Sequence, residues 1–237
     1  MRAADAVVSL YYRTKNKEIL GYAVELGSRS VVPEIKVAMA RQLYQNQLVE
    51  LALLGAVESK PEIERQFVKQ NSDLRMKVAA ARAMVILGEK EPYFGYLFEI
   101  ANRYADDDPV TGDRDLRQAG QSAMRMIGGV PGDEARTFFE RALDSKNSDV
   151  VDRALINLRI TYPDSEKGRE RMLQELRGQP TLSAETICRL AAMTNDPAIR
   201  QAAAKRNALL WQRSALHEVK WDRGPWLRAM GISSLPK

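Results

Sequence analysis

One segment of this chain recurs after 40 residues, and this repetition constrains the fold more than any other feature. Residues 76–88 read MKVAAARAMVILG, and residues 116–128 read LRQAGQSAMRMIG. In both segments apolar or small side chains fall at positions i, i+4, i+7, i+8 and i+11, which share one face of an α-helix. We therefore predict two amphipathic helices that belong to equivalent structural units.

Both helices have small residues at positions i+4 and i+7. These are Ala80 and Ala83 in the first helix, and Gly120 and Ala123 in the second. Side chains of this size let a neighbouring helix approach closely, so we expect this face to be buried. Each segment ends in a glycine, Gly88 or Gly128, which suits the left-handed conformation that closes many helices.

Polar residues stand before these helices and predict their first turns. Asp73 with its neighbours, and Asp113 or Asp115, can accept hydrogen bonds from backbone amides that the first turn leaves unpaired. Asn147–Asp149 does the same for a third copy that begins at Val150 and stops at Pro163. A second helix is predicted after each of the three, over residues 93–104, 133–143 and 167–176. The unit is thus a helix hairpin that needs neighbours to bury its faces.

The same helix ending occurs earlier in the chain at Leu26-Gly27 and Leu54-Gly55, followed by Pro33 and Pro61 at plausible first positions of partner helices. The resulting helix pairs span residues 16–45, 46–70, 72–105, 113–145, 148–178 and 182–209. Residues 35–43 also fit the first-helix pattern. A register shifted by one helix in the two N-terminal pairs therefore stays open.

The pattern V-R-x-x-A-x-x-A-L-x-x-L-G, visible at residues 76–88 and 116–128, resembles the short bacterial HEAT repeats that also occur in phycocyanobilin lyases. The likeness is good over residues 71–178, fair over 16–70 and 182–209, and ends near residue 210. It implies an all-α fold, an α-α superhelix of about six helix pairs over residues 1–209 with a C-terminal cap or tail over 210–237. First helices would lie on the convex side and second helices on the concave side, and no activity is implied.

The residues that usually carry chemistry are scarce. The chain has one cysteine, Cys188, and one histidine, His217, which excludes an internal disulfide framework and His-rich zinc sites. The acidic run at residues 105–115 could suit calcium, but Pro109 and Val110 occupy ligand positions, so an ordinary helix-capping loop is favoured. We expect no catalytic residue, no cofactor and no metal.

Cations gather in the second half of the chain. The whole sequence has 36 basic and 31 acidic residues, whereas residues 1–120 hold 17 of each. The candidate partner-binding residues lie on the later second helices, and they are Arg136, Arg141, Arg169, Arg171, Arg200, Lys205 and Arg206. They could contact phosphates along one groove, but interleaved glutamates such as Glu140 and Glu175 also suit ordinary ion pairs on a helix surface.

These observations favour a non-catalytic protein–protein interaction scaffold that uses its concave face to bind a protein or peptide. The alternative is a nucleic-acid-binding protein that uses the basic second helices and the basic C-terminal segment. That segment contains Trp211, Trp221 and Trp226, and we predict that it caps the last repeat. An enzyme of the chromophore-lyase type rests on the resemblance alone. No apolar run approaches the roughly 20 residues that span a bilayer. We therefore expect a cytoplasmic protein. Whether a segment upstream of residue 1 was removed stays open.

Overall fold

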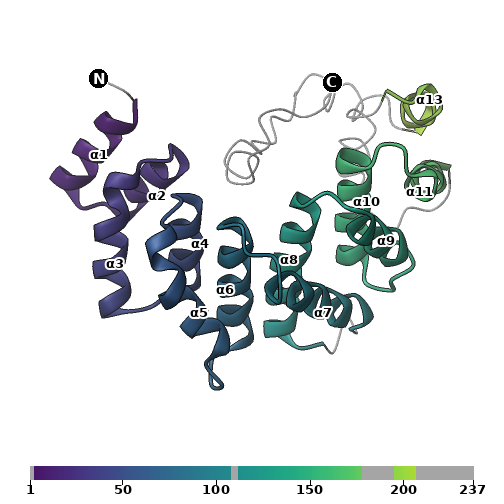
Figure 1. Cartoon of the computed structure of the whole chain (residues 1–237). Coiled ribbons are helices and arrows are strands. Elements are labelled where there is room, and N and C mark those ends of the chain that lie inside the picture. The colour runs from purple at the N-terminus through teal and green to yellow at the C-terminus, as the bar shows by residue number, and fades with distance from the viewer. Residues whose placement is uncertain (1–2, 108–111, 178–194, 207–237) are drawn as a thin grey trace. The chain divides into compact units, whose positions relative to one another are not determined.

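The computed structural model describes residues 3–107, 112–177 and 195–206, and every regular element in these ranges is helical (Figure 1). The predicted all-α class is therefore confirmed for the described residues. The α-helices are α1 (Ala3–Thr14), α2 (Lys17–Glu25), α3 (Val32–Arg41), α4 (Gln45–Leu53), α5 (Lys60–Val68), α6 (Leu74–Ile86), α7 (Tyr93–Asp106), α8 (Arg114–Gly129), α9 (Asp133–Ala142), α10 (Ser148–Thr161), α11 (Glu166–Arg177) and α13 (Pro197–Arg206). Two short 3₁₀ helices, η1 (Arg29–Val31) and η2 (Val57–Ser59), precede α3 and α5.

The described helices form two compact units that divide within α7, between Ile100 and Ala101. Unit 1 contains α1 to α6 and the start of α7, and unit 2 contains the end of α7 and the helices that follow. The predicted boundary near residue 210 lies outside the described residues. No helix in the described ranges is long and apolar enough to cross a membrane.

Unit 1 is a series of packed helices in which α1 packs on α2, α3 on α4, and α6 on both α4 and α5. Its predicted helix endings are confirmed, because Gly27, Gly55 and Gly88 all have positive φ, with 91° at Gly88. A residue with a Cβ is strained there, so glycine closes these helices with little strain. The three endings follow α2, α4 and α6.

The starts of the helices also follow the sequence pattern. The Asp73 carboxylate accepts a hydrogen bond from the Met76 amide at the start of α6, and Asn147 caps α10 by accepting from Asp149. At α8 the cap is Asp113, whose carboxylate accepts from the Asp115 amide. Of the two candidates at that position, Asp115 is therefore the first-turn donor and not the cap.

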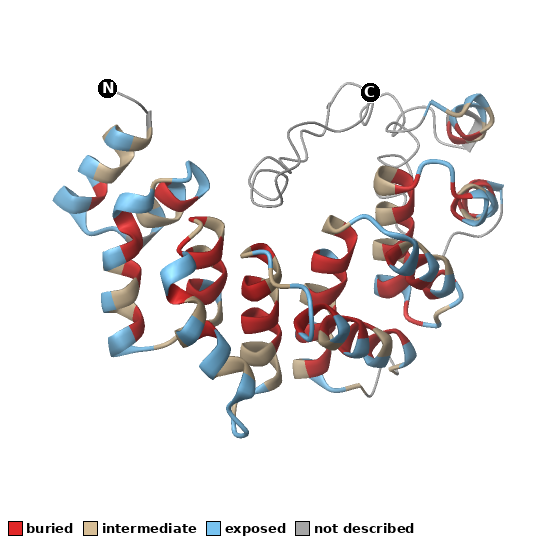
Figure 2. Cartoon of the chain, viewed as in Figure 1, coloured by how far each residue is buried: buried red, intermediate tan, exposed pale blue. Residues whose placement is uncertain are grey.

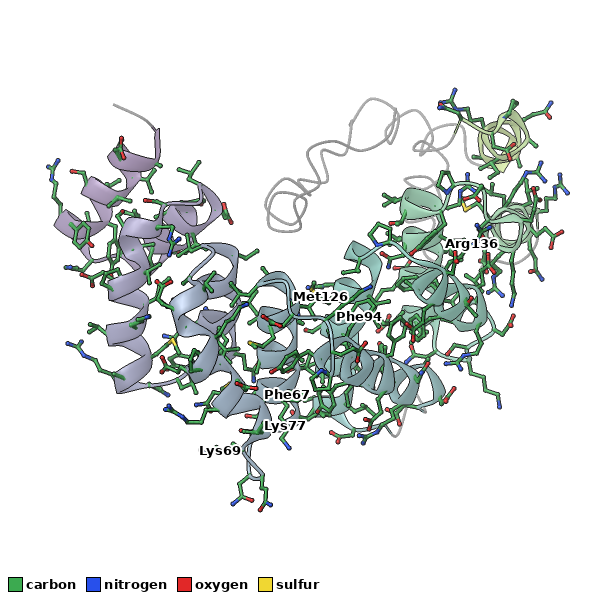
Figure 3. The ribbon with its side chains drawn as sticks, viewed as in Figure 1. Phe67, Lys69, Lys77, Phe94, Met126 and Arg136 are labelled. Atoms are coloured by element: carbon green, nitrogen blue, oxygen red, sulfur yellow. The ribbon has the colours of Figure 1, made fainter. Side chains whose placement is uncertain are left out.

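The small residues of the repeat are buried, as predicted. Ala80 and Ala83 in α6 and Ala123 in α8 are each 0% exposed, and Figure 2 shows buried stripes along the helices. Aromatic side chains fill the end of unit 1, where the Phe67 ring lies 4.9 Å from that of Tyr93 and 5.2 Å from that of Tyr96 (Figure 3). Small residues thus permit close helix contacts, and aromatic rings fill the wider spaces.

In unit 2, α10 packs against α8, α9 and α11, and α11 packs against α13. Gly120 of α8 faces the buried Tyr104, where a Cβ atom would overlap the tyrosine Cβ and Cγ. The prediction that Gly128 ends its helix is wrong, because α8 continues through Gly129. Gly128 instead makes room for Asn157 of α10, whose Cγ would lie 2.6 Å from a Cβ at this position.

Candidate partner-binding surface

The predicted cations lie on α9, α11 and α13, but the described side chains interact with acceptors inside unit 2. Arg136 of α9 contacts Glu140 at 3.2 Å and Asp164 at 2.8 Å. Arg169 of α11 contacts Asp196, the residue before α13, at 2.6 Å. The structure therefore brings carboxylates to the cations that were predicted to face a partner.

The remaining described candidates also have acceptors within the unit. Arg171 contacts the buried Glu175 at 2.8 Å and donates to the Leu143 carbonyl oxygen at 3.5 Å. Arg141 donates to the Asn102 side chain, and Arg200 donates to that of Asn195. The side chains of Lys205 and Arg206 lie outside the described residues, as do Cys188, His217, the three tryptophans, the 210–237 segment and residues 108–111 of the acidic loop.

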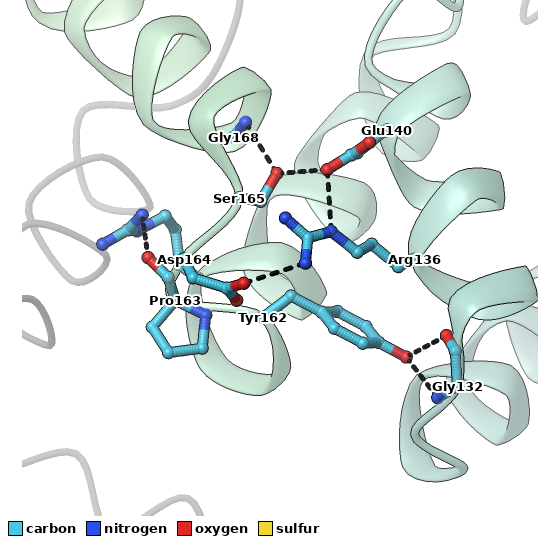
Figure 4. Close-up of polar contacts among 9 residues, drawn as sticks. Gly132, Arg136, Glu140, Tyr162, Pro163, Asp164, Ser165 and Gly168 are labelled. Carbon is cyan, nitrogen blue, oxygen red and sulfur yellow. Dashed lines mark hydrogen bonds and ion pairs between the residues drawn. The ribbon is translucent and has the colours of Figure 1, made fainter.

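Arg136 (Figure 3) belongs to a polar joint between α9 and the turn that leads into α11 (Figure 4). The Ser165 hydroxyl donates to Glu140 Oε1 at 2.7 Å and accepts from the Gly168 amide at 3.2 Å. Beside it, the Tyr162 hydroxyl accepts from the Gly132 amide and donates to the Gly132 carbonyl. These bonds connect two successive helix pairs, so the joint stabilises their packing.

Local electrostatics keep two of the paired carboxylates ionised, Glu140 in the joint and Asp196 beside Arg169. The hydrogen bond from the Ser165 hydroxyl and then the Arg136 guanidinium lower the pKa of Glu140 below its usual value. Burial alone would raise the pKa of Asp196, but the hydrogen bonds from Arg169 and from two backbone amides outweigh burial and lower it. Both acids therefore balance their arginines at neutral pH.

Ion pairs of similar sequence separation, 27 to 29 residues, recur in both units. They are Arg29–Glu58 and Lys60–Glu89 in unit 1, and Arg136–Asp164 and Arg169–Asp196 in unit 2. Exposed pairs of this kind contribute little stability one by one. Ion pairs with nearly the same sequence separation thus occur in both units.

Replacing Arg171 with alanine is expected to lower the free energy of unfolding by about 2 kcal/mol, because it leaves the buried Glu175 without this cation. Glu175 is 3% exposed, whereas the Arg171 side chain is 23% exposed and remains partly solvated. Arg200→Ala is the matched control, since it removes an exposed arginine from the same surface and should change stability by less than about 0.5 kcal/mol. Urea denaturation followed by circular dichroism measures both, and equal effects would contradict a structural role for Arg171.

Glu140→Gln is expected to lower the melting temperature at pH 7 by about 2–4 °C, equivalent to about 1 kcal/mol. A carboxylate with a lowered pKa stabilises the fold fully above its unfolded value of about 4.3, and this contribution is lost as the pH falls through the folded value. Melting curves of wild type and variant should therefore converge below about pH 4. Glu170→Gln removes an exposed charge from α11 as a control. A constant difference from pH 7 to pH 3 would contradict this account.

Unit 1 presents a different surface, because all the large apolar side chains that are exposed among the described residues lie in it. They are Leu10, Tyr12, Tyr22, Leu26, Val37, Tyr44, Val57 and Val68. Tyr22 lies in α2, and Leu26 caps the C-terminal end of that helix four residues later, so the two side chains project to the same side. We refer to these side chains together as the unit 1 apolar surface.

The first helix pair of unit 1 exposes a position that the second pair buries. Leu26 and Leu54 both precede a helix-ending glycine, yet Leu26 is 49% exposed and Leu54 only 4%. Tyr12 of α1 donates from its hydroxyl to the Ser30 carbonyl oxygen at 3.2 Å, and its side chain is also exposed. The aromatic and aliphatic surface at this end of unit 1 is therefore accessible to another molecule.

The sequence predicted neither the exposed apolar side chains of unit 1 nor the acids that pair with the arginines of unit 2. The repeat pattern identifies the apolar positions of unit 1, but sequence spacing alone does not tell which of them a neighbour covers. The interleaved acids signalled that the cations would be paired, but not that Asp164 and Asp196, outside the second helices, would be partners.

Among the described residues, no group of three or more His, Cys, Asp and Glu side chains is placed to hold a metal ion.

Comparisons with known proteins give no match: no family model, no curated protein and no solved structure matches this chain.

Proposed function

We propose that this chain is a non-catalytic protein-binding scaffold built from HEAT-like helix pairs, and that a protein or peptide docks on the unit 1 apolar surface. The observation that carries this proposal is that, in the part of the chain that the structure describes, the exposed large apolar side chains all lie in unit 1. Apolar groups left in water at one part of a surface are characteristic of protein interaction sites. Tyrosine, present at positions 12, 22 and 44, is enriched among interface residues.

The pairing of the second-helix arginines supports a protein partner more than a nucleic acid. A phosphate backbone is bound by cations whose charge is not already balanced, and such binding releases counterions. Arg136, Arg169 and Arg171 have carboxylates within 3.2 Å. We therefore place the docking surface on unit 1 in preference to the arginine-bearing second helices.

Affinity capture from the lysate of the source organism tests the proposal when three proteins are compared. These are the wild type, the double variant Tyr22→Ser with Leu26→Ser, and a control, Arg103→Ser with Lys146→Ser, that alters exposed positions of unit 2. A protein partner should be retained by the wild type and the control after nuclease treatment and at high salt, and lost from the apolar variant. A ligand that is nucleic acid and is released by salt would contradict the proposal, as would a partner that binds the apolar variant equally well.

A further inference from the structure

α8 packs against α10 in unit 2, and this packing brings one arginine of each helix close enough for their charges to interact. Gly128 of α8 lies against Asn157 of α10, and Thr161 donates from its hydroxyl to the Gly128 carbonyl oxygen at 3.3 Å. One turn earlier on each helix stand Arg125 and Arg153, at the spacing that puts them on the same side as Gly128 and Asn157. The two guanidinium groups therefore belong to the same seam.

In the part of the chain that the structure describes, no ion pair balances the charge of these two arginines. Among the described residues, neither guanidinium forms an ion pair or a hydrogen bond, in contrast to the arginines of the second helices. Burial, and then the charge of Arg125, lower the pKa of Arg153. Asp149, Asp152 and Tyr104 act in the opposite direction and offset this only in part.

The pair remains accessible although it lies between two helices. Arg125 is exposed and Arg153 is half-buried, so an anion that approaches from solvent can reach both groups. An incoming anion would neutralise the repulsion between the two cations and would supply hydrogen-bond acceptors to their donors. Binding is thus favoured by a repulsion that is already present in the free protein.

We propose that Arg125 and Arg153 form a site for a carboxylate presented by an acidic side chain of a protein partner. This inference rests on the proposed function and assigns a second contact for the partner, on unit 2. A carboxylate fits better than a nucleic-acid backbone, because Asp149 and Asp152 on the same helix interrupt any continuous basic stripe. A single acidic group meets the two guanidinium groups without the run of cations that a polyphosphate requires.

A fluorescein-labelled hexaglutamate peptide is the probe, and its fluorescence anisotropy at low salt measures binding to the full chain. The double variant Arg125→Gln with Arg153→Gln should bind it about tenfold more weakly than wild type, because charge-assisted hydrogen bonds are lost. The control is Arg114→Gln with Lys146→Gln, which lowers the net charge equally at exposed positions, one on α8 and one just before α10. It should retain affinity within about twofold.

Stability provides a second measurement on the same variants. Arg125→Gln removes the repulsion on Arg153, so its melting temperature without peptide should equal or exceed that of wild type. The double variant should also melt close to the wild-type temperature, which would show that its weaker peptide binding does not arise from unfolding. A melting temperature well below wild type would overturn the inference, because it would show that the arginine pair stabilises the seam.

Three binding results would also overturn the inference. They are an absence of hexaglutamate binding by wild type below about 1 mM, an equal loss in the charge-matched control, and tighter binding of a thymidine 20-mer through the same arginines. Failure of this inference can be distinguished from failure of the proposed function. Peptide binding that does not depend on the arginines, with partner capture retained, overturns the arginine site alone. Capture that does not depend on Tyr22 and Leu26, with arginine-dependent peptide binding retained, overturns the unit 1 docking surface alone.

Discussion

Replacing Gly120 with alanine is expected to lower the free energy of unfolding of unit 2 by about 3 kcal/mol. Gly120 stands in the middle of α8 against Tyr104, which is fully buried. An added Cβ would overlap the Cβ and Cγ atoms of the tyrosine and lie 2.7 Å from its Cδ1. The overlapped atoms are those nearest the tyrosine backbone, so a rotamer change does not remove the clash and the helices themselves must separate.

The matched control is Gly21→Ala in α2, another glycine inside a helix. Nothing lies within 4 Å of a Cβ built at Gly21. Alanine favours the helix over glycine, so this variant should gain roughly 0.5–1 kcal/mol. Urea denaturation followed by circular dichroism should therefore move the two variants in opposite directions. A Gly120→Ala protein as stable as wild type would show that α8 and the end of α7 are not in close contact.

Replacing Ala80 with glutamate is expected to destabilise unit 1 by on the order of 3 kcal/mol or more. Ala80 is 0% exposed in α6, which packs against α4 and α5. The carboxylate would either be buried without a partner or force these helices apart. Ala123→Glu places the same charge at a fully buried position of α8, the one that matches Ala83 in the repeat, and should have an effect of similar size on unit 2.

Exposed Ala40 in α3 provides the control for this charge insertion. Ala40→Glu adds the same side chain on the solvent side of a helix and should change stability by less than about 0.5 kcal/mol. Thermal melts compare the three glutamate variants directly. If Ala80→Glu or Ala123→Glu melted at the wild-type temperature, the assignment of that buried face would be wrong.

Much of the helical structure was predictable because its signals are local. Helix periodicity, the caps Asp73 and Asn147, and the endings at Gly27, Gly55 and Gly88 each depend on residues within a few positions of one another. Gly128 shows where this reasoning fails. Its place in the repeat matches Gly88, but its role is set by Asn157, a residue on a different helix that no local pattern identifies.

The candidate surface was less predictable, because exposure and charge balance depend on which elements pack together. Leu26 and Leu54 occupy equivalent sequence positions, and only the packing shows that one is open and the other buried. Arg136 and Arg125 are likewise both arginines on amphipathic helices. Asp164 reaches the first, whereas no described acid pairs with the second. Sequence spacing identifies the cations, but it does not identify the acidic residues that reach them from other segments of the chain.

Photo-crosslinking in lysate tests the central claim, a partner docked on the unit 1 apolar surface, most directly. A benzophenone amino acid is placed at position 22 or 44 in unit 1, or at position 103 or 146 in unit 2, and the adducts are compared after irradiation. The account predicts a discrete protein adduct from positions 22 and 44 that is much weaker from positions 103 and 146. Adducts from unit 2 alone, or an equal yield from all four positions, would contradict it.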